Sequence, residues 1–150
     1  NIALNFSALN CPGVADLIYI DPPYFSSSGS HTTYHSKYHF LEGLANYSDI
    51  ESNINWEKKN NEITINKSSE FEKPISFLMQ LQQLVSNYPD SQIVISYRNK
   101  GIPTIEEISN MLRQVRPSDR VLVIDLGLYS YALNKSNDTN NEFLIISTNH

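Results

Sequence analysis

The chain has 150 residues, 16 of them acidic and 11 basic, which gives a formal net charge of −5 at pH 7. This length suits one domain with a hydrophobic core, but the excess of acid argues against a strong nucleic-acid-binding surface. One cysteine, Cys11, excludes a disulfide framework and a thiolate zinc site, and the lack of a signal peptide or an apolar stretch of about 18 residues predicts a soluble, cytoplasmic protein.

The first half of the chain contains one predicted strand between irregular segments. Residues 1–14 are an irregular or partly helical lead-in, and the apolar run Ala15–Asp21 is typical of a strand buried in a parallel sheet. Pro22 and Pro23 end this strand, because each lacks an N–H and fixes φ. Phe25–Lys37 is a loop rich in serine, which fits a lid over a substrate as well as it fits an ordinary loop.

The sequence next predicts a helix over Lys37–Asn46. A polar excursion over Tyr47–Ser69, with a short hairpin, follows, and then a second helix over Glu72–Asn87. Pro74 suits the first turn of the last helix. Its apolar face is predicted to lie in the core and consists of Phe77, Leu78, Leu81, Leu84 and Val85.

The second half of the chain contains the remaining predicted strands and one more helix. Gln92–Tyr97 is a second apolar strand that ends at the same sheet edge as Asp21. Thr104 is expected to cap a helix over Ile105–Val115, with Glu107 completing a capping box. Two strands, Val121–Tyr131 and Glu142–Thr148, are expected to form an antiparallel hairpin around the polar turn Asn134–Asn141.

The sequence Asp21-Pro22-Pro23-Tyr24 is the strongest chemical signal in the chain. A stiff turn here fixes a carboxylate, proline carbonyls and an aromatic ring at the carboxyl end of a strand, where open α/β sheets bind ligands. A carboxylate and a carbonyl that accept both N–H groups of an aromatic amine would localise its lone pair, while the ring stacks on the base. A base must leave the duplex to reach such a pocket. The alternative is a plain Pro-Pro turn with a capping aspartate and a surface tyrosine.

Together with Leu17-Ile18-Tyr19-Ile20, this turn resembles the D-L-x-Y-x-D-P-P-Y motif of adenine-specific DNA methyltransferases that use S-adenosylmethionine. Three weaker segments fit the same family in order, namely Tyr38–Ala45, Ile93–Arg98 and Glu142–Ile146. The resemblance extends from about Ala15 to Thr148. It implies an α/β, partial Rossmann-like methyltransferase fold with parallel strands, flanking helices and a carboxyl-terminal antiparallel hairpin.

The resemblance also implies roles for individual residues. Asp21 would accept a hydrogen bond from the amino group of a flipped adenine and relay its proton, the Pro22 carbonyl would accept the second N–H, and Tyr24 would stack. Asp21 and Tyr24 would also contact the methyl donor. The expected substrate contacts are Pro23, Phe25, Tyr34, Lys37, Tyr38, Arg98 and Lys100, with Tyr129 and Tyr131 as further candidates. Taken singly, Arg98 and Lys100 also fit solvated surface charges, and Tyr129 and Tyr131 also fit core or surface packing.

A complete enzyme of this family also carries a glycine-rich turn of F-x-G-x-G type for the methyl donor. The five glycines here are isolated and no G-x-G exists. The expected organisation is therefore a single domain, 1–150, that forms the catalytic half of a methyltransferase. The other half would come from a missing amino-terminal segment or a partner chain, and the chain alone would be inactive or weak.

Several alternatives stay open at this point. The motif also serves amino methylation of cytosine and of RNA bases, and the chain also fits a non-catalytic remnant or subunit. A plain interaction domain with an accidental D-P-P-Y turn is a further alternative. His31, His35 and His39 recur at four-residue spacing, but no metal is expected, because the surrounding sequence disfavours a helix and no fourth ligand is evident. The recognition sequence and any companion restriction enzyme are not predictable.

Overall fold

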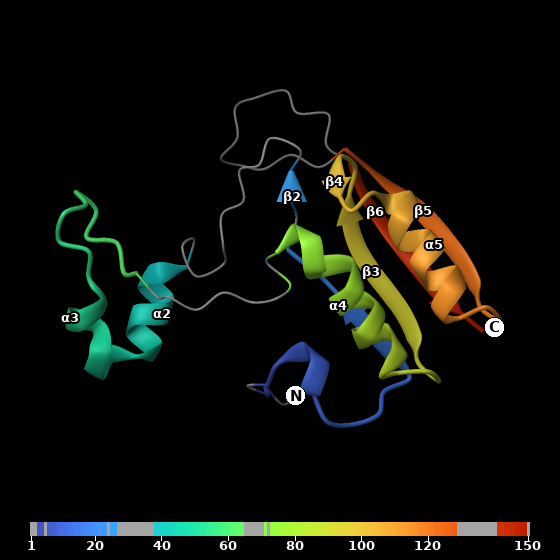
Figure 1. Ribbon diagram of the computed structural model, residues 1–150, viewed down its shortest axis with the longest axis horizontal. Coiled ribbons are helices and arrows are strands. Elements are labelled where there is room, and N and C mark those ends of the chain that lie inside the picture. Colours follow the sequence, from blue (N-terminus) through green and yellow to red (C-terminus); the bar gives the residue numbers. More distant parts are fainter. Residues whose placement is uncertain are drawn as a thin grey trace.

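A computed structural model describes residues 3–4, 6–23, 25–26, 38–64, 71, 73–128 and 141–149. Its centre is a four-stranded sheet in the order β1-β3-β6-β5 (Figure 1). The strands are β1 (Leu17–Ile20), β3 (Gln92–Arg98), β5 (Arg120–Leu128) and β6 (Asn141–Thr148). This order brings the first and the last parts of the chain onto one sheet.

The sheet combines parallel and antiparallel pairs, as the sequence predicts. β1 pairs with β3 in parallel, with Ile20 opposite Ile95, whereas β3–β6 and β5–β6 are antiparallel. β1 is shorter than the predicted Ala15–Asp21 because its pairing ends before the two prolines. Asn141, predicted as part of the turn, is the first residue of β6.

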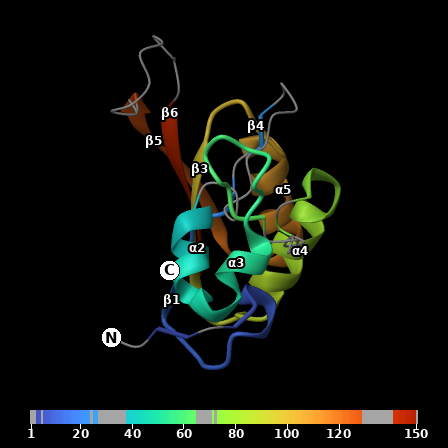
Figure 2. The same cartoon turned by 90° about the vertical axis from the view of Figure 1, so that its left-hand side faces the viewer.

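The helices α4 (Pro74–Ser86) and α5 (Ile105–Val115) lie on the same side of the sheet (Figures 1 and 2). Pro74 occupies the first turn of α4, as predicted. At α5 the predicted capping box is present, since the Thr104 hydroxyl accepts from the Glu107 N–H and the Glu107 carboxylate accepts from the Thr104 N–H. Both helix predictions are therefore confirmed, with end shifts in α4 only.

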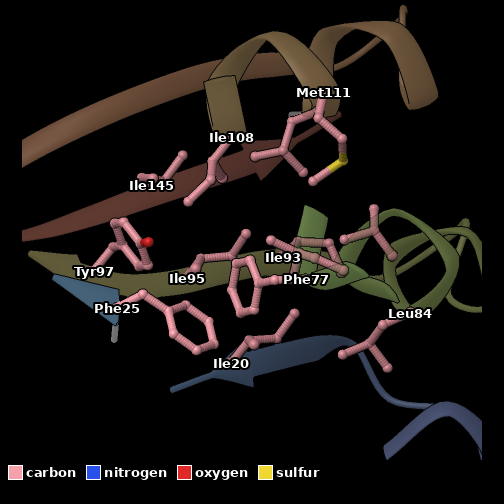
Figure 3. Packing of buried hydrophobic residues seen from close by; sticks show 13 residues of the cluster. Ile20, Phe25, Phe77, Leu84, Ile93, Ile95, Tyr97, Ile108, Met111 and Ile145 are labelled. Atoms are coloured by element: carbon pink, nitrogen blue, oxygen red, sulfur yellow. The ribbon is translucent and has the colours of Figure 1, made fainter. Parts of the chain in front are cut away.

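The hydrophobic core fills the space between these helices and the sheet (Figure 3). The β3 side chains that face the helices are Ile93, Ile95 and Tyr97, each with 0% exposure. Because side chains of a strand alternate between its faces, these three point the same way. The helix and β6 residues that bury the most against them are Phe77, Leu81, Ile108, Leu112 and Ile145.

A buried arginine, Arg116, bonds segments that follow α5 and precede β3. The Arg116 guanidinium, just after α5, donates to the carbonyls of Tyr88 (3.0 Å) and Ser91 (2.7 Å). Its Nε also bonds Oδ2 of Asp119 at 2.6 Å, and Oδ2 accepts from the Ser147 hydroxyl at 2.7 Å. Arg116 thus joins the end of α5 to the α4–β3 connection directly, and to β6 through Asp119.

The opposite face of the sheet carries an exposed apolar row that crosses all four strands. The register places Tyr19, Val94, Ile146 and Leu122 side by side on this face. Tyr19 is 58% exposed and the other three are half-buried. The prediction that the Ala15–Asp21 strand is buried is therefore wrong for this face, because Leu17 and Tyr19 of β1 are 51% and 58% exposed.

A small helical unit lies to one side of the sheet in Figure 1. It contains α2 (His39–Ala45), η2 (Tyr47–Asp49), α3 (Ile50–Asn53) and an antiparallel bridge between Ile54 and Ile63. The bridge confirms the expected short hairpin in the polar excursion. The α2 helix packs through Gly43, where an added Cβ would lie 2.2 Å from Ile63 Cδ1. Its predicted apolar side, which consists of Phe40, Leu41 and Leu44, is exposed.

Candidate functional site

The end of β1 places one carboxylate at the carboxyl edge of the sheet. Ile20 is buried among the core residues, Asp21 is exposed, Pro22 is buried and Pro23 is half-buried. This alternation continues that of the strand, so Pro22 holds the turn against the protein while the Asp21 carboxylate is left accessible. Tyr24 lies outside the described residues.

The end of β3 supplies the second part of this edge, because β1 and β3 run in parallel. The Ser96 hydroxyl is buried and donates to Glu142 Oε1 at 3.0 Å, and Arg98 lies opposite Glu142 in the β3–β6 register. Lys100 follows in a turn, exposed and with a φ of 57°. The parallel pairing fits the prediction that Asp21, Arg98 and Lys100 follow the same edge of the sheet, and their roles in a site stay predictions.

The sequence predicts that Phe25 begins a loop, but the structure places it in a strand. Phe25–Ser26 forms the short strand β2, which pairs antiparallel with β4 (Gly101–Ile102), and Phe25 lies opposite Ile102. The Phe25 side chain is only 3% exposed, and its ring meets Phe77 edge-on at a centroid distance of 5.7 Å. Figure 3 shows it pointing into the core beside Ile20. The structure thus places in the core a residue that was expected to contact the substrate.

The β4 strand approaches the core closely at Gly101. A Cβ atom added there would lie 2.5 Å from Cε1 and 2.8 Å from Oη of Tyr97, whose ring is fully buried. Real Cβ atoms do not tolerate such distances in a close-packed interior. Glycine at this position therefore permits the pairing of β4 with β2.

Of the remaining predicted contacts, the structure describes Tyr38, which is not brought to this edge. Tyr38 is half-exposed at the start of α2, in the helical unit that lies apart from the β1–β3 edge in Figure 1. The other candidates named from the sequence fall, like Tyr24, outside the described part of the chain, namely Tyr34, Lys37, Tyr129, Tyr131, His31 and His35. Their predicted roles stay predictions.

No group of three or more histidine, cysteine, aspartate or glutamate side chains within the described ranges could hold a metal ion. His39 Nδ1 instead accepts a hydrogen bond from the Ile63 N–H at 3.3 Å. Among the helices that the structure describes, none is long and apolar enough to cross a membrane.

Two features of this edge were missed by the sequence analysis. The bond from Ser96 to Glu142 joins β3 to β6, and no local pattern predicts a cross-strand pair of this kind. The β2–β4 pairing was also missed, although an isolated glycine directly after the polar pair Asn99-Lys100 is a recognisable turn signal.

The arrangement offers an exposed carboxylate on a rigid turn, with an arginine and a lysine on the neighbouring strand end. A carboxylate held in this way can accept a hydrogen bond from a ligand amino group and then its proton. The exposed carboxylate of Asp21 and the buried pyrrolidine of Pro22 suit this chemistry. Among the described glycines, Gly43 and Gly101 are closely packed against Ile63 and Tyr97, whereas a Cβ added at Gly13 or Gly127 would meet nothing within 4 Å.

Comparison with known proteins finds similarity to a curated methylase. Over 105 residues, the chain is 30% identical to the modification methylase StsI of Streptococcus sanguinis. The match includes 67% of this chain but only 14% of the relative's length. No family model and no solved structure matches the chain. The similarity to a modification methylase supports the relationship to DNA methyltransferases that the Asp21-Pro22-Pro23-Tyr24 sequence indicates.

Proposed function

We propose that this chain is the catalytic part of an adenine-specific DNA methyltransferase that uses S-adenosylmethionine. The observation that carries the proposal is the exposed Asp21 carboxylate on a Pro-Pro turn at the carboxyl end of a parallel strand. Open α/β sheets bind their ligands at this edge. The similarity to a modification methylase supports the same class of reaction.

In the proposed reaction the residues of the turn activate the adenine amino group. This group is a poor nucleophile because its lone pair is delocalised into the ring. Asp21 accepts one N–H and the Pro22 carbonyl accepts the other, which draws the lone pair towards the incoming methyl group. S-adenosylmethionine, when bound, supplies that methyl group as an electrophile. The proton that the amino group loses passes to Asp21.

Orientation is the second task of the turn. The base leaves the duplex before it reaches the sheet edge, and Tyr24 stacks on it so that the amino group stays in line. Arg98 and Lys100 lie on the neighbouring strand end, where they contact the flipped nucleotide or its phosphate. The net charge of −5 places most other phosphate contacts on the remainder of the protein or on a partner.

A second candidate is a methyltransferase subunit that cannot hold the methyl donor without another polypeptide. The isolated glycines favour it, because none of them forms a G-x-G turn and Gly101 is needed for packing against Tyr97. The residues present thus fit the amino-group side of the reaction and not the methionine-binding side. In this candidate the chain contributes Asp21 and the base pocket only.

The test measures transfer of a labelled methyl group to adenine in DNA, by the chain alone and by the product of its complete reading frame. We expect activity from the complete product and little or none from the chain. Asp21→Ala is expected to lower the rate by about 100-fold or more, as for the loss of a group that stabilises a transition state. Asp90→Ala removes an exposed carboxylate elsewhere and serves as the control.

Two outcomes would contradict these proposals. An undiminished rate in Asp21→Ala would remove this carboxylate from the reaction. Tight, stoichiometric binding of S-adenosylmethionine to the isolated chain, measured by calorimetry, would contradict the view that the methyl-donor site lies outside it.

A further inference from the structure

The Pro22-Pro23 turn lies between β1 and β2, whose partner strands β3 and β4 belong to one continuous stretch of chain, Gln92–Ile102. Before the turn, β1 pairs with β3, and directly after it β2 pairs with β4. β3 and β4 are separated only by Asn99 and Lys100. The distance between the two fixed ends of the turn therefore depends on how β4 lies relative to β3.

Packing behind the turn fixes the position of β4. The Phe25 ring meets Phe77 at 5.7 Å, and Phe77 stacks on Tyr97 at a centroid distance of 6.4 Å and an interplanar angle of 30° (Figure 3). Tyr97 in turn lies directly under Gly101. The rings connect the residue after the turn to the glycine of its partner strand, so a change at Gly101 is transmitted to Phe25.

The connection between β3 and β4 is also fastened to the hairpin. The Asn99 N–H donates to the Asn141 carbonyl at 3.0 Å, and the Asn141 N–H donates to Asn99 Oδ1 at 3.0 Å. Because this end of β3 is bonded to β6, β3 and β4 cannot move together to relieve crowding at Gly101. Crowding at Gly101 must instead displace β4 or the buried Tyr97 ring.

We infer that Gly101 is a positioning residue for the Asp21 carboxylate, and this inference rests on the proposed methyl transfer. By leaving room for the Tyr97 ring, Gly101 lets β4 hold Phe25, and the stiff prolines pass that position on to Asp21. A misplacement of about 1 Å in a reacting group can cost about 100-fold in rate. Gly101 therefore acts on the catalytic step without contacting the substrate.

The test compares Gly101→Ala with Leu112→Ala in the active protein. Leu112 is fully buried on α5, so its loss destabilises the core while leaving both ends of the turn in place. At a temperature where circular dichroism shows both variants folded, we expect Gly101→Ala to lower kcat by about 10-fold or more, with a KM for DNA within about threefold of the wild type. Leu112→Ala is expected to keep both constants.

Combination with Asp21→Ala separates positioning from a general loss of stability. If Gly101 acts through Asp21, adding Gly101→Ala to Asp21→Ala changes the rate by less than about twofold, because the affected group is already gone. Rate losses that multiply in the double variant would overturn the inference. So would an unchanged kcat in Gly101→Ala.

Amide hydrogen exchange tests the inference about Gly101 separately from the proposed function, because it does not depend on methyl transfer. Amide hydrogen exchange at Phe25 and Ser26 is expected to accelerate in Gly101→Ala and to stay unchanged in Leu112→Ala. Unchanged exchange in both variants would refute the connection between Gly101 and β2. If the wild-type protein transfers no methyl group to DNA, only the proposed function is refuted. If Gly101→Ala does not fold, Phe25→Ala loosens β2 from its other side and should show the same lack of additivity with Asp21→Ala.

Discussion

Replacement of Asp119 by alanine is expected to remove a large share of the stability of this chain. The carboxylate is 7% exposed and bonds the Arg116 guanidinium, which is 5% exposed, at 2.6 Å. It also accepts the Ser147 hydroxyl. Without Asp119, a buried positive charge keeps only the carbonyls of Tyr88 and Ser91 as partners.

The expected loss follows from the burial of both partners. Breaking a buried ion pair on one side costs about 3–5 kcal/mol, because the remaining charge stays desolvated. The total free energy of unfolding of a domain is about 5–15 kcal/mol, so Asp119→Ala would remove roughly a fifth or more of it. At about 2–4 °C per kcal/mol for a chain of this size, the Tm should fall by roughly 6–20 °C.

Urea denaturation followed by circular dichroism measures this loss, with Arg113→Ala as the matched control. Arg113 lies on the same helix and is exposed, with a hydrogen bond to the Asn110 side chain at 2.9 Å. Its removal is expected to cost less than about 1 kcal/mol, as for other exposed polar contacts. A similar small loss in Asp119→Ala would refute the view that this ion pair is buried and structurally required.

Two further predictions concern the helices. Hydrogen bonds from the Thr104 N–H and hydroxyl lower the pKa of Glu107 below its ordinary value of 4.5. The contribution of the Glu107 carboxylate to stability is therefore present above pH 4.5 and lost as the pH falls through the lowered pKa. Glu107→Gln should remove this part of the acid dependence of Tm. Leu81→Ala should cost about 2–5 kcal/mol in urea denaturation, whereas Ile75→Ala on the same helix should cost almost nothing, because Ile75 is 99% exposed and Leu81 is 0% exposed.

The elements that the sequence predicts well are those whose signals are local. The α5 helix begins after Thr104 and ends at Val115, as predicted, because the capping residues and the following proline act within a few positions. The end of β1 is equally local, since two prolines follow it. The placement of Asp21 and Arg98 at one edge then requires only that both strands run in parallel.

The features that could not be predicted depend on contacts between distant segments. A two-residue strand such as β2 has no periodicity, and only its pairing with Gly101–Ile102 defines it. The burial of Arg116 could not be predicted either, because the carbonyls that it bonds, those of Tyr88 and Ser91, come from a distant part of the chain. Phe25 was assigned to a substrate pocket for the same reason, as its core partner Phe77 is far away in the chain.

The apolar row formed by Tyr19, Val94, Ile146 and Leu122 has a consequence for the colloidal behaviour of the chain. Each Å² of apolar surface withdrawn from water contributes about 25 cal/mol to the free energy of association. A flat apolar surface that meets this face of the sheet is therefore expected to bind to it. In a concentrated preparation the nearest such surface is the same row on another molecule. We therefore expect this face of the sheet to favour self-association of the isolated chain, and the excess of carboxylates to oppose it.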